Sequence, residues 1–107
     1  MKRGDLYLVR KPGRDAKKQR VFAVVSRQDF IDTRFSTVVC APVYSRRLGL
    51  STEVAVGIAE GLKGECALHA DALASVPKSM LTDYVGCLGP MKLAELDRAL
   101  RIALAVE

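Results

Sequence analysis

Residues 36–47 read STVVCAPVYSRR, and this stretch decides how the chain folds and where its chemistry lies. Its first half is short, apolar and rich in β-branched residues, a pattern typical of a buried strand. Pro42 lacks an N–H group and cannot take a fully paired place in a central strand, so we expect the strand to end, bulge or reach an edge there. Because Tyr44, Ser45 and two arginines follow at once, the strand brings hydroxyl and guanidinium groups to one rim of the fold.

A second strand is predicted over Arg20 to Arg27, which read RVFAVVSR. If it pairs antiparallel with the strand of residues 36–45, the first residue of one strand lies beside the last residue of the other. Arg20 then lies near Tyr44 and Ser45. We therefore expect the catalytic chemistry at these three residues.

The rest of the pattern predicts further short strands and one terminal helix. Short helical turns are expected within residues 28–35 and 77–81. Strands are expected at Asp5–Arg10, Ser51–Val56 and Thr82–Leu88, with one or two more within residues 65–76. From Pro90 to Val106 an amphipathic helix should cover the open end of the sheet with an apolar stripe, which consists of Leu93, Leu96, Leu100, Ala103 and Leu104.

These elements predict a mainly β protein with a C-terminal α-helix. A chain of 107 residues suits one domain, residues 1–107, with one core. About six short strands in so small a chain favour a strongly bent antiparallel sheet or a partly open barrel.

Basic residues concentrate in the first half of the chain. The net charge is +5, but residues 1–50 hold 12 Lys/Arg and 4 Asp/Glu, whereas residues 51–107 hold 5 and 8. A basic half favours a polyanionic partner, nucleic acid or an acidic polypeptide, although a solvated charged surface would leave the same pattern. The candidate phosphate-binding residues lie in a basic loop at residues 11–19 and after residue 45: Lys11, Arg14, Lys17, Lys18, Arg46 and Arg47.

The sequence argues against several other classes of protein. Its three cysteines are an odd number without paired short spacing, which indicates small buried residues and neither a disulfide framework nor a zinc site. No metal-ligand cluster and no glycine-rich phosphate loop occurs, so neither a metal nor a cofactor is expected. No apolar run is long enough to cross a bilayer and no signal region follows Met1, so we expect a cytoplasmic protein without membrane contact.

The order of the segments resembles the MazF/PemK family of bacterial toxins, the endoribonucleases of type II toxin–antitoxin systems. Seven matches occur in the family's order over nearly the whole chain: KRGDLYLV, RVFAVVS, VVCAPVYSRR, GLSTEVAVG, EGLKGE, SVPKSMLTDYVGCLG and LAELDRALRIAL. The resemblance implies an SH3-like barrel of the PemK/CcdB kind and a homodimer with an RNA groove across its interface. It also implies metal-independent, sequence-specific cleavage of single-stranded mRNA, and inhibition by a cognate antitoxin whose acidic, flexible tail occupies the groove.

Within this resemblance Arg20 takes the place of the family's catalytic arginine. The family's catalytic threonine falls on Tyr44, with Ser45 next to it, so a hydroxyl is kept but on a phenol. Either residue could replace the threonine. Ala72 and Ala74 stand where a glutamine and an arginine are common, which leaves the recognised base sequence open, as well as the choice among messenger, ribosomal and transfer RNA.

Metal-free cleavage of RNA uses the 2′-hydroxyl group of the substrate as nucleophile. A guanidinium group suits the stabilisation of charge on phosphorus and suits proton removal poorly, so Arg20 is interpreted as a phosphate clamp. Tyr44 or Ser45 could donate or relay a proton. His69 is the lone histidine and the alternative base, but a half-exposed strand histidine is the favoured interpretation, and the resemblance relies on no histidine there.

Two alternatives remain open from the sequence. A CcdB-like gyrase poison would need an exposed apolar or aromatic tail, whereas this sequence ends in a predicted helix. The missing threonine keeps open a non-catalytic SH3-like module that binds nucleic acid, or a degenerate toxin.

Overall fold

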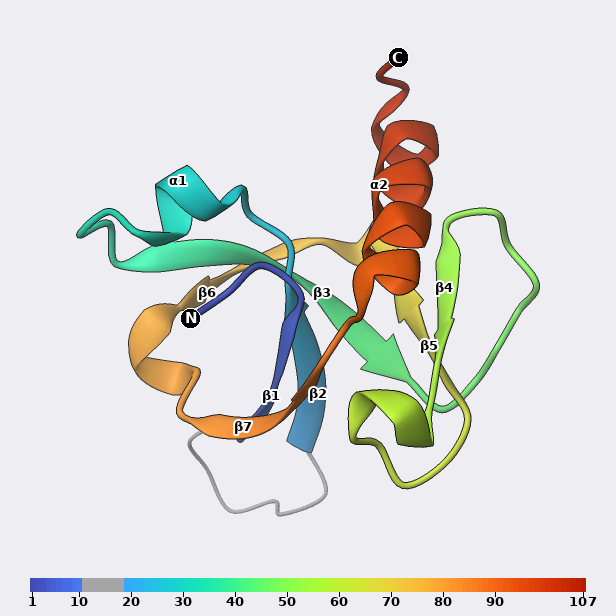
Figure 1. The fold of residues 1–107 in the computed structure, drawn as a ribbon, viewed down its shortest axis with the longest axis horizontal. Coiled ribbons are helices and arrows are strands. Elements are labelled where there is room, and N and C mark those ends of the chain that lie inside the picture. Colours follow the sequence, from blue (N-terminus) through green and yellow to red (C-terminus); the bar gives the residue numbers. More distant parts are fainter. Residues whose placement is uncertain (11–18) are drawn as a thin grey trace.

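The computed structural model describes residues 1–10 and 19–107, in which a strongly curved antiparallel sheet carries a C-terminal helix on one face (Figure 1). The strands follow the order β4-β5-β3-β2-β1-β7, and β6 pairs with β3 beside this path. They are β1 (Asp5–Arg10), β2 (Gln19–Val24), β3 (Thr37–Tyr44), β4 (Glu53–Val56), β5 (Cys66–His69), β6 (Ala74–Pro77) and β7 (Asp83–Cys87). The helices are α1 (Gln28–Ile31) and α2 (Pro90–Leu104), with single 3₁₀ turns at Ile58–Glu60, Ala70–Ala72 and Lys78–Met80.

Strand β3 is the centre of the sheet and does not end at Pro42. Val25 donates its N–H to the carbonyl of Val39 at 2.9 Å, so these two residues form a hydrogen-bonded pair. Hydrogen-bonded and non-hydrogen-bonded pairs alternate along antiparallel strands. Pro42 falls in a non-hydrogen-bonded pair, so its backbone nitrogen points away from β2. On the other side of β3 the neighbour changes from β6, beside residues 37–40, to β5, beside residues 43–44. The proline therefore lies where no neighbouring strand offers an acceptor for a backbone N–H, and β3 continues to Tyr44.

The two faces of the sheet bury two separate cores, because side chains alternate along each strand. The first core packs against α2 and includes Leu6, Ala23, Ala41, Val43, Val54, Leu68, Leu96 and Ala99. The second core lies on the opposite face and includes Tyr7, Val9, Val24, Ile31, Val38, Cys40, Val76 and Leu81.

Helix α2 confirms most of the predicted apolar stripe. Leu93, Leu96, Leu100 and Ala103 all pack at the first core, but Leu104 is 57% exposed at the last turn. Gly89 precedes the helix and Pro90 occupies its first turn, where a missing N–H costs no helical hydrogen bond. No helix in the described part of the chain is long and apolar enough to cross a membrane.

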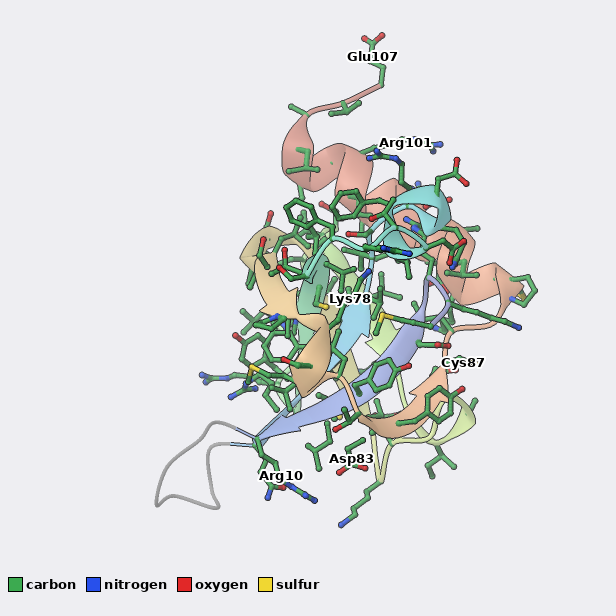
Figure 2. All side chains as sticks on the ribbon, turned by 90° about the vertical axis from the view of Figure 1, so that its left-hand side faces the viewer. Arg10, Lys78, Asp83, Cys87, Arg101 and Glu107 are labelled. Atoms are coloured by element: carbon green, nitrogen blue, oxygen red, sulfur yellow. The ribbon has the colours of Figure 1, made fainter. Side chains whose placement is uncertain are left out.

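Side chains hold the remaining segments against the sheet. Lys78 donates from Nζ to the carbonyls of Ile31 at 2.9 Å and Thr33 at 2.7 Å, which ties the turn after β6 to α1 (Figure 2). Arg10 and Asp83 form an ion pair at 3.2 Å between β1 and β7 (Figure 2). This exposed pair connects the end of β1 with the start of β7.

The predicted strands are all present, although their ends differ. The segment 65–76 contains two strands, β5 and β6, separated by a 3₁₀ turn. The strand predicted to run to Arg27 ends at Val24. Beyond it, the N–H of Val39 donates to the side-chain Oγ of Ser26 at 2.8 Å instead of to a backbone carbonyl of a continued strand. Most of the basic loop predicted at residues 11–19 lies outside the described residues, and Gln19 begins β2.

The cysteines are all free in the structure. Cys40 is buried, and this burial raises the pKa of its thiol to about 12, so it acts as a small apolar residue. Cys66 is half-buried and Cys87 is exposed, so the expectation of three buried cysteines is wrong for the last two.

Candidate functional site

The start of β2 and the end of β3 meet as the antiparallel pairing predicts. Val21 is paired with Val43, which places Arg20 opposite Tyr44. The guanidinium carbon of Arg20 lies 4.1 Å from the centre of the Tyr44 ring, within cation–π range, and its Nη1 donates to the carbonyl of Val43 at 3.4 Å. The strand pairing predicted for Arg20 and Tyr44 is thus confirmed, and the guanidinium group is oriented at the rim of the sheet.

A groove of about 540 Å³ opens beside this pair. Arg20 and Tyr44 line it together with apolar side chains of the same sheet face, Phe22, Pro42 and Val76 among them. Residues 20, 22 and 24 of β2 and 40, 42 and 44 of β3 alternate onto this face, so the second core opens directly into the groove. The groove therefore lies where the second core reaches the solvent.

Small residues form another wall of the groove. Ala72 lines it from the 3₁₀ turn between β5 and β6, and Ala74 and Ser75 line it from β6. Their short side chains leave the floor open. A planar or apolar group could lie on that floor while an attached anion meets Arg20.

The other predicted site residues have different surroundings. Ser45 is exposed in the bend after β3 and is not among the residues that line the groove. Arg46 is exposed in the following loop. Arg47 forms an ion pair with Glu65 at 2.9 Å, so a new anion would have to compete with this carboxylate. Lys11, Arg14, Lys17 and Lys18 lie outside the described residues.

His69 forms one cluster with Arg20 and Tyr44, which the sequence did not indicate. Its ring meets the ring of Tyr44 edge-on, with centres 4.8 Å apart and planes at 88°. Its Nε2 lies 3.2 Å from Oε2 of Glu53, which is paired with it across β4 and β5. The strand predictions contained both residues, but only the register of the strands places them side by side.

Glu53 is a nearly buried carboxylate at the edge of the cluster. Its side chain is 6% exposed, and it accepts the N–H groups of Leu48, at 3.0 and 3.1 Å, and of Leu50, at 2.6 Å. The backbone N–H of Leu48 and then that of Leu50 hold the pKa of Glu53 below its usual value, and His69 adds to this effect. The carboxylate is therefore charged at neutral pH.

Three side chains of different chemistry meet in the cluster. A guanidinium group, a phenol and an imidazole converge from β2, β3 and β5. In the part of the chain that the structure describes, no three His, Cys, Asp or Glu residues come together as a metal site. The chemistry on offer is anion binding and proton transfer.

Comparison with known families gives one match over almost the whole chain. Residues 2–104 match the family described as PemK-like, MazF-like toxin of type II toxin–antitoxin system. No curated protein sequence matches the chain.

Solved structures share the fold. The Mycobacterium tuberculosis toxin MazF-mt6 is 21% identical with a TM-score of 0.82, over 96% of this chain and 98% of that one. An endoribonuclease in complex with its cognate antitoxin, from a mycobacterial species, is 25% identical with a TM-score of 0.83, over 98% of this chain and 95% of that one. MazE-MazF from Deinococcus radiodurans is 22% identical with a TM-score of 0.77, over 100% of this chain and 97% of that one.

Proposed function

The chain belongs to the PemK-like, MazF-like toxins of type II toxin–antitoxin systems, and we propose that it is an endoribonuclease that cleaves single-stranded mRNA at specific sequences without a metal ion. The observation that carries the proposal is the guanidinium group of Arg20 above the Tyr44 ring, at the mouth of a groove with an apolar floor. The relative named an endoribonuclease, 25% identical over nearly the whole chain, supports the same activity.

In the proposed reaction the 2′-oxygen of the substrate attacks the adjacent phosphorus. The bond from the 2′-oxygen to phosphorus forms while the bond from phosphorus to the 5′-oxygen breaks, which leaves a 2′,3′-cyclic phosphate and a 5′-hydroxyl group. Arg20 binds the phosphate oxygens and stabilises the charge that develops on them. Of the two candidate hydroxyl groups, Tyr44 is favoured, because it lines the groove whereas Ser45 does not.

The apolar floor supports a single-stranded substrate. Unpaired bases can stack on aromatic and apolar side chains, whereas bases within a duplex are already stacked on one another. Phe22, Pro42 and Val76 offer such a surface next to Arg20. Arg46, and Arg47 once released from Glu65, would then contact the backbone of the strand, as would the basic residues 11, 14, 17 and 18.

The purified protein is expected to cleave a mixed RNA in the presence of excess chelator, because the proposed chemistry uses only side chains and the substrate's own hydroxyl group. Mapped ends should carry a 2′,3′-cyclic phosphate, and a DNA strand of the same sequence should stay intact because it lacks the 2′-hydroxyl group. Activity that is lost in chelator and restored by magnesium would contradict the proposal. Binding without cleavage would favour the non-catalytic nucleic-acid module, and inhibited gyrase supercoiling with intact RNA would favour the gyrase poison.

We propose that a cognate antitoxin inhibits the toxin through an acidic, flexible tail that lies in the same groove. Support comes from the net charge of +8 in residues 1–50, and from relatives whose structures are named as complexes with an antitoxin. In the cleavage assay an acidic peptide should compete with RNA, and its inhibition should weaken as salt is raised. Inhibition that salt leaves unchanged would contradict this mode of binding. We propose that the toxin acts in the cytoplasm, where its RNA substrate and its antitoxin would be.

We further propose a homodimer of two single-domain chains, with the RNA groove completed by the second copy. Large apolar side chains stay exposed on one described chain, Phe35 at 57% and Ile102 at 47% among them, and a partner would cover such surface. Sedimentation at micromolar concentration is expected to show a species of twice 11.7 kDa. A lone 11.7 kDa species would rule the homodimer out.

A further inference from the structure

Glu53 contacts two parts of the candidate site. On one side its carboxylate accepts the N–H groups of Leu48 and Leu50, which shapes the loop that carries Arg46 and Arg47. On the other side it contacts His69, whose ring packs against Tyr44. The side chains of Glu53 and His69 are only 6% and 13% exposed.

The hydrogen-bond partners of His69 determine where its proton lies. Nε2 faces two oxygen atoms, Oε2 of Glu53 at 3.2 Å and the carbonyl of Arg46 at 3.4 Å. A carboxylate and a carbonyl can only accept, so Nε2 must carry a hydrogen atom. Neutral His69 is then the Nε2–H tautomer, and its lone pair lies on Nδ1.

We propose that Glu53 is a positioning residue of the RNA-cleaving site, which holds the loop of Arg46 and Arg47 and holds His69 with its lone pair on Nδ1 beside Tyr44. This inference rests on the function proposed above. It assigns to Tyr44 and His69 the proton transfer for which a guanidinium group is unsuited.

The proton steps then balance without any further reactant. The hydroxyl group of Tyr44, which lines the groove, takes the 2′-hydroxyl proton and passes its own proton to Nδ1 of His69 as the 2′-oxygen bonds to phosphorus. The leaving 5′-oxygen takes a proton from the hydroxyl group of Tyr44. The proton on His69 then returns to Tyr44, which restores both side chains.

Substitution of Glu53 by glutamine separates its two tasks. The amide oxygen can keep the position of Oε1 and still accept from Leu50 at 2.6 Å and from Leu48 at 3.1 Å, while the contact of Leu48 with Oε2 is lost. The opposite orientation would point the NH₂ group at the N–H of Leu50, the shorter contact. The NH₂ group then faces Nε2 of His69 at the shorter of its two contacts, and a donor there favours the Nδ1–H tautomer over the Nε2–H tautomer that the carbonyl of Arg46 favours. Glu53→Ala removes both tasks at once.

Glu53→Gln is expected to lower kcat by about 10²-fold with KM close to that of the wild type, since acid–base groups typically contribute at least that much. Glu53→Ala should lose as much in kcat and also raise KM, because the arginine loop is released. The ¹⁵N chemical shifts of His69 should show the Nε2–H tautomer in the wild type and Nδ1–H in Glu53→Gln. Glu95→Gln, on the exposed side of α2, is the matched control and should match the wild type.

Several results would overturn the proposal. Wild-type kcat in a Glu53→Gln protein whose His69 has become the Nδ1–H tautomer would show that the tautomer does not matter. An unchanged Nε2–H tautomer would show that Glu53 does not set it. If the wild type cleaves no RNA, the proposed function fails separately, and hydrogen exchange still tests the positioning: the Leu48 and Leu50 amides must lose protection in Glu53→Ala.

Discussion

Replacement of Arg20 by alanine is expected to lower kcat by at least about 10²–10³-fold, the usual loss when a donor that stabilises transition-state charge is removed. Arg20 is exposed near the start of β2 and belongs to neither core, so the variant should fold like the wild type. Initial rates on one RNA substrate, together with a circular dichroism spectrum and the sedimentation coefficient, measure this directly.

Two further variants make the Arg20 experiment specific. Arg98→Ala removes the same charge from the exposed face of α2 and should leave cleavage unchanged. Arg20→Lys keeps the charge but loses the bidentate fork of a guanidinium group, so it should recover only part of the rate. Full activity in a folded Arg20→Ala protein would remove Arg20 from the mechanism.

The same assay ranks the neighbouring residues of the cluster. Tyr44→Phe should show an intermediate loss, whereas Ser45→Ala should stay near the wild-type rate because Ser45 does not line the groove. The strand argument and the family resemblance predict that His69→Ala keeps most activity. Its contacts with Tyr44 and Glu53 lead to the opposite expectation, a loss comparable to that of Glu53→Gln.

The largest expected effect on stability comes from Leu68→Ala. Leu68 is 0% exposed in β5, opposite Val43 of β3 and Val54 of β4, so its removal leaves a cavity in the first core. Such substitutions typically cost about 2–5 kcal/mol, a large share of the roughly 5–15 kcal/mol that stabilises a small domain. Urea unfolding should show a lower midpoint at an unchanged m-value.

Leu104→Ala is the matched control for the core substitution. Its side chain is 57% exposed at the end of α2, and exposed substitutions usually change stability by less than about 0.5 kcal/mol. Equal losses in the two variants would mean that α2 buries Leu104 in solution, for example against a second copy of the chain.

The local pattern of the sequence was enough to predict the architecture. The β-branched run before Pro42 and the spacing of Leu93, Leu96 and Leu100 indicate a buried strand and an amphipathic helix, because periodicity is a property of neighbouring residues. Pro42 shows the limit of this argument. Whether a missing N–H ends a strand depends on which strand lies beside it, and here β5 and β6 leave that position free.

Sequence by itself therefore determined the element types, the family resemblance and the pairing that brings Arg20 to Tyr44. Only the tertiary structure decided that His69 and Glu53 join them, since those residues lie 16 positions apart and meet through the register of β4 and β5. A shift of that register by one residue would turn either side chain to the opposite face of the sheet. Register is fixed by the burial of whole strands such as β5, with Ala67 and Leu68 at its centre, and residue types near the site do not reveal it.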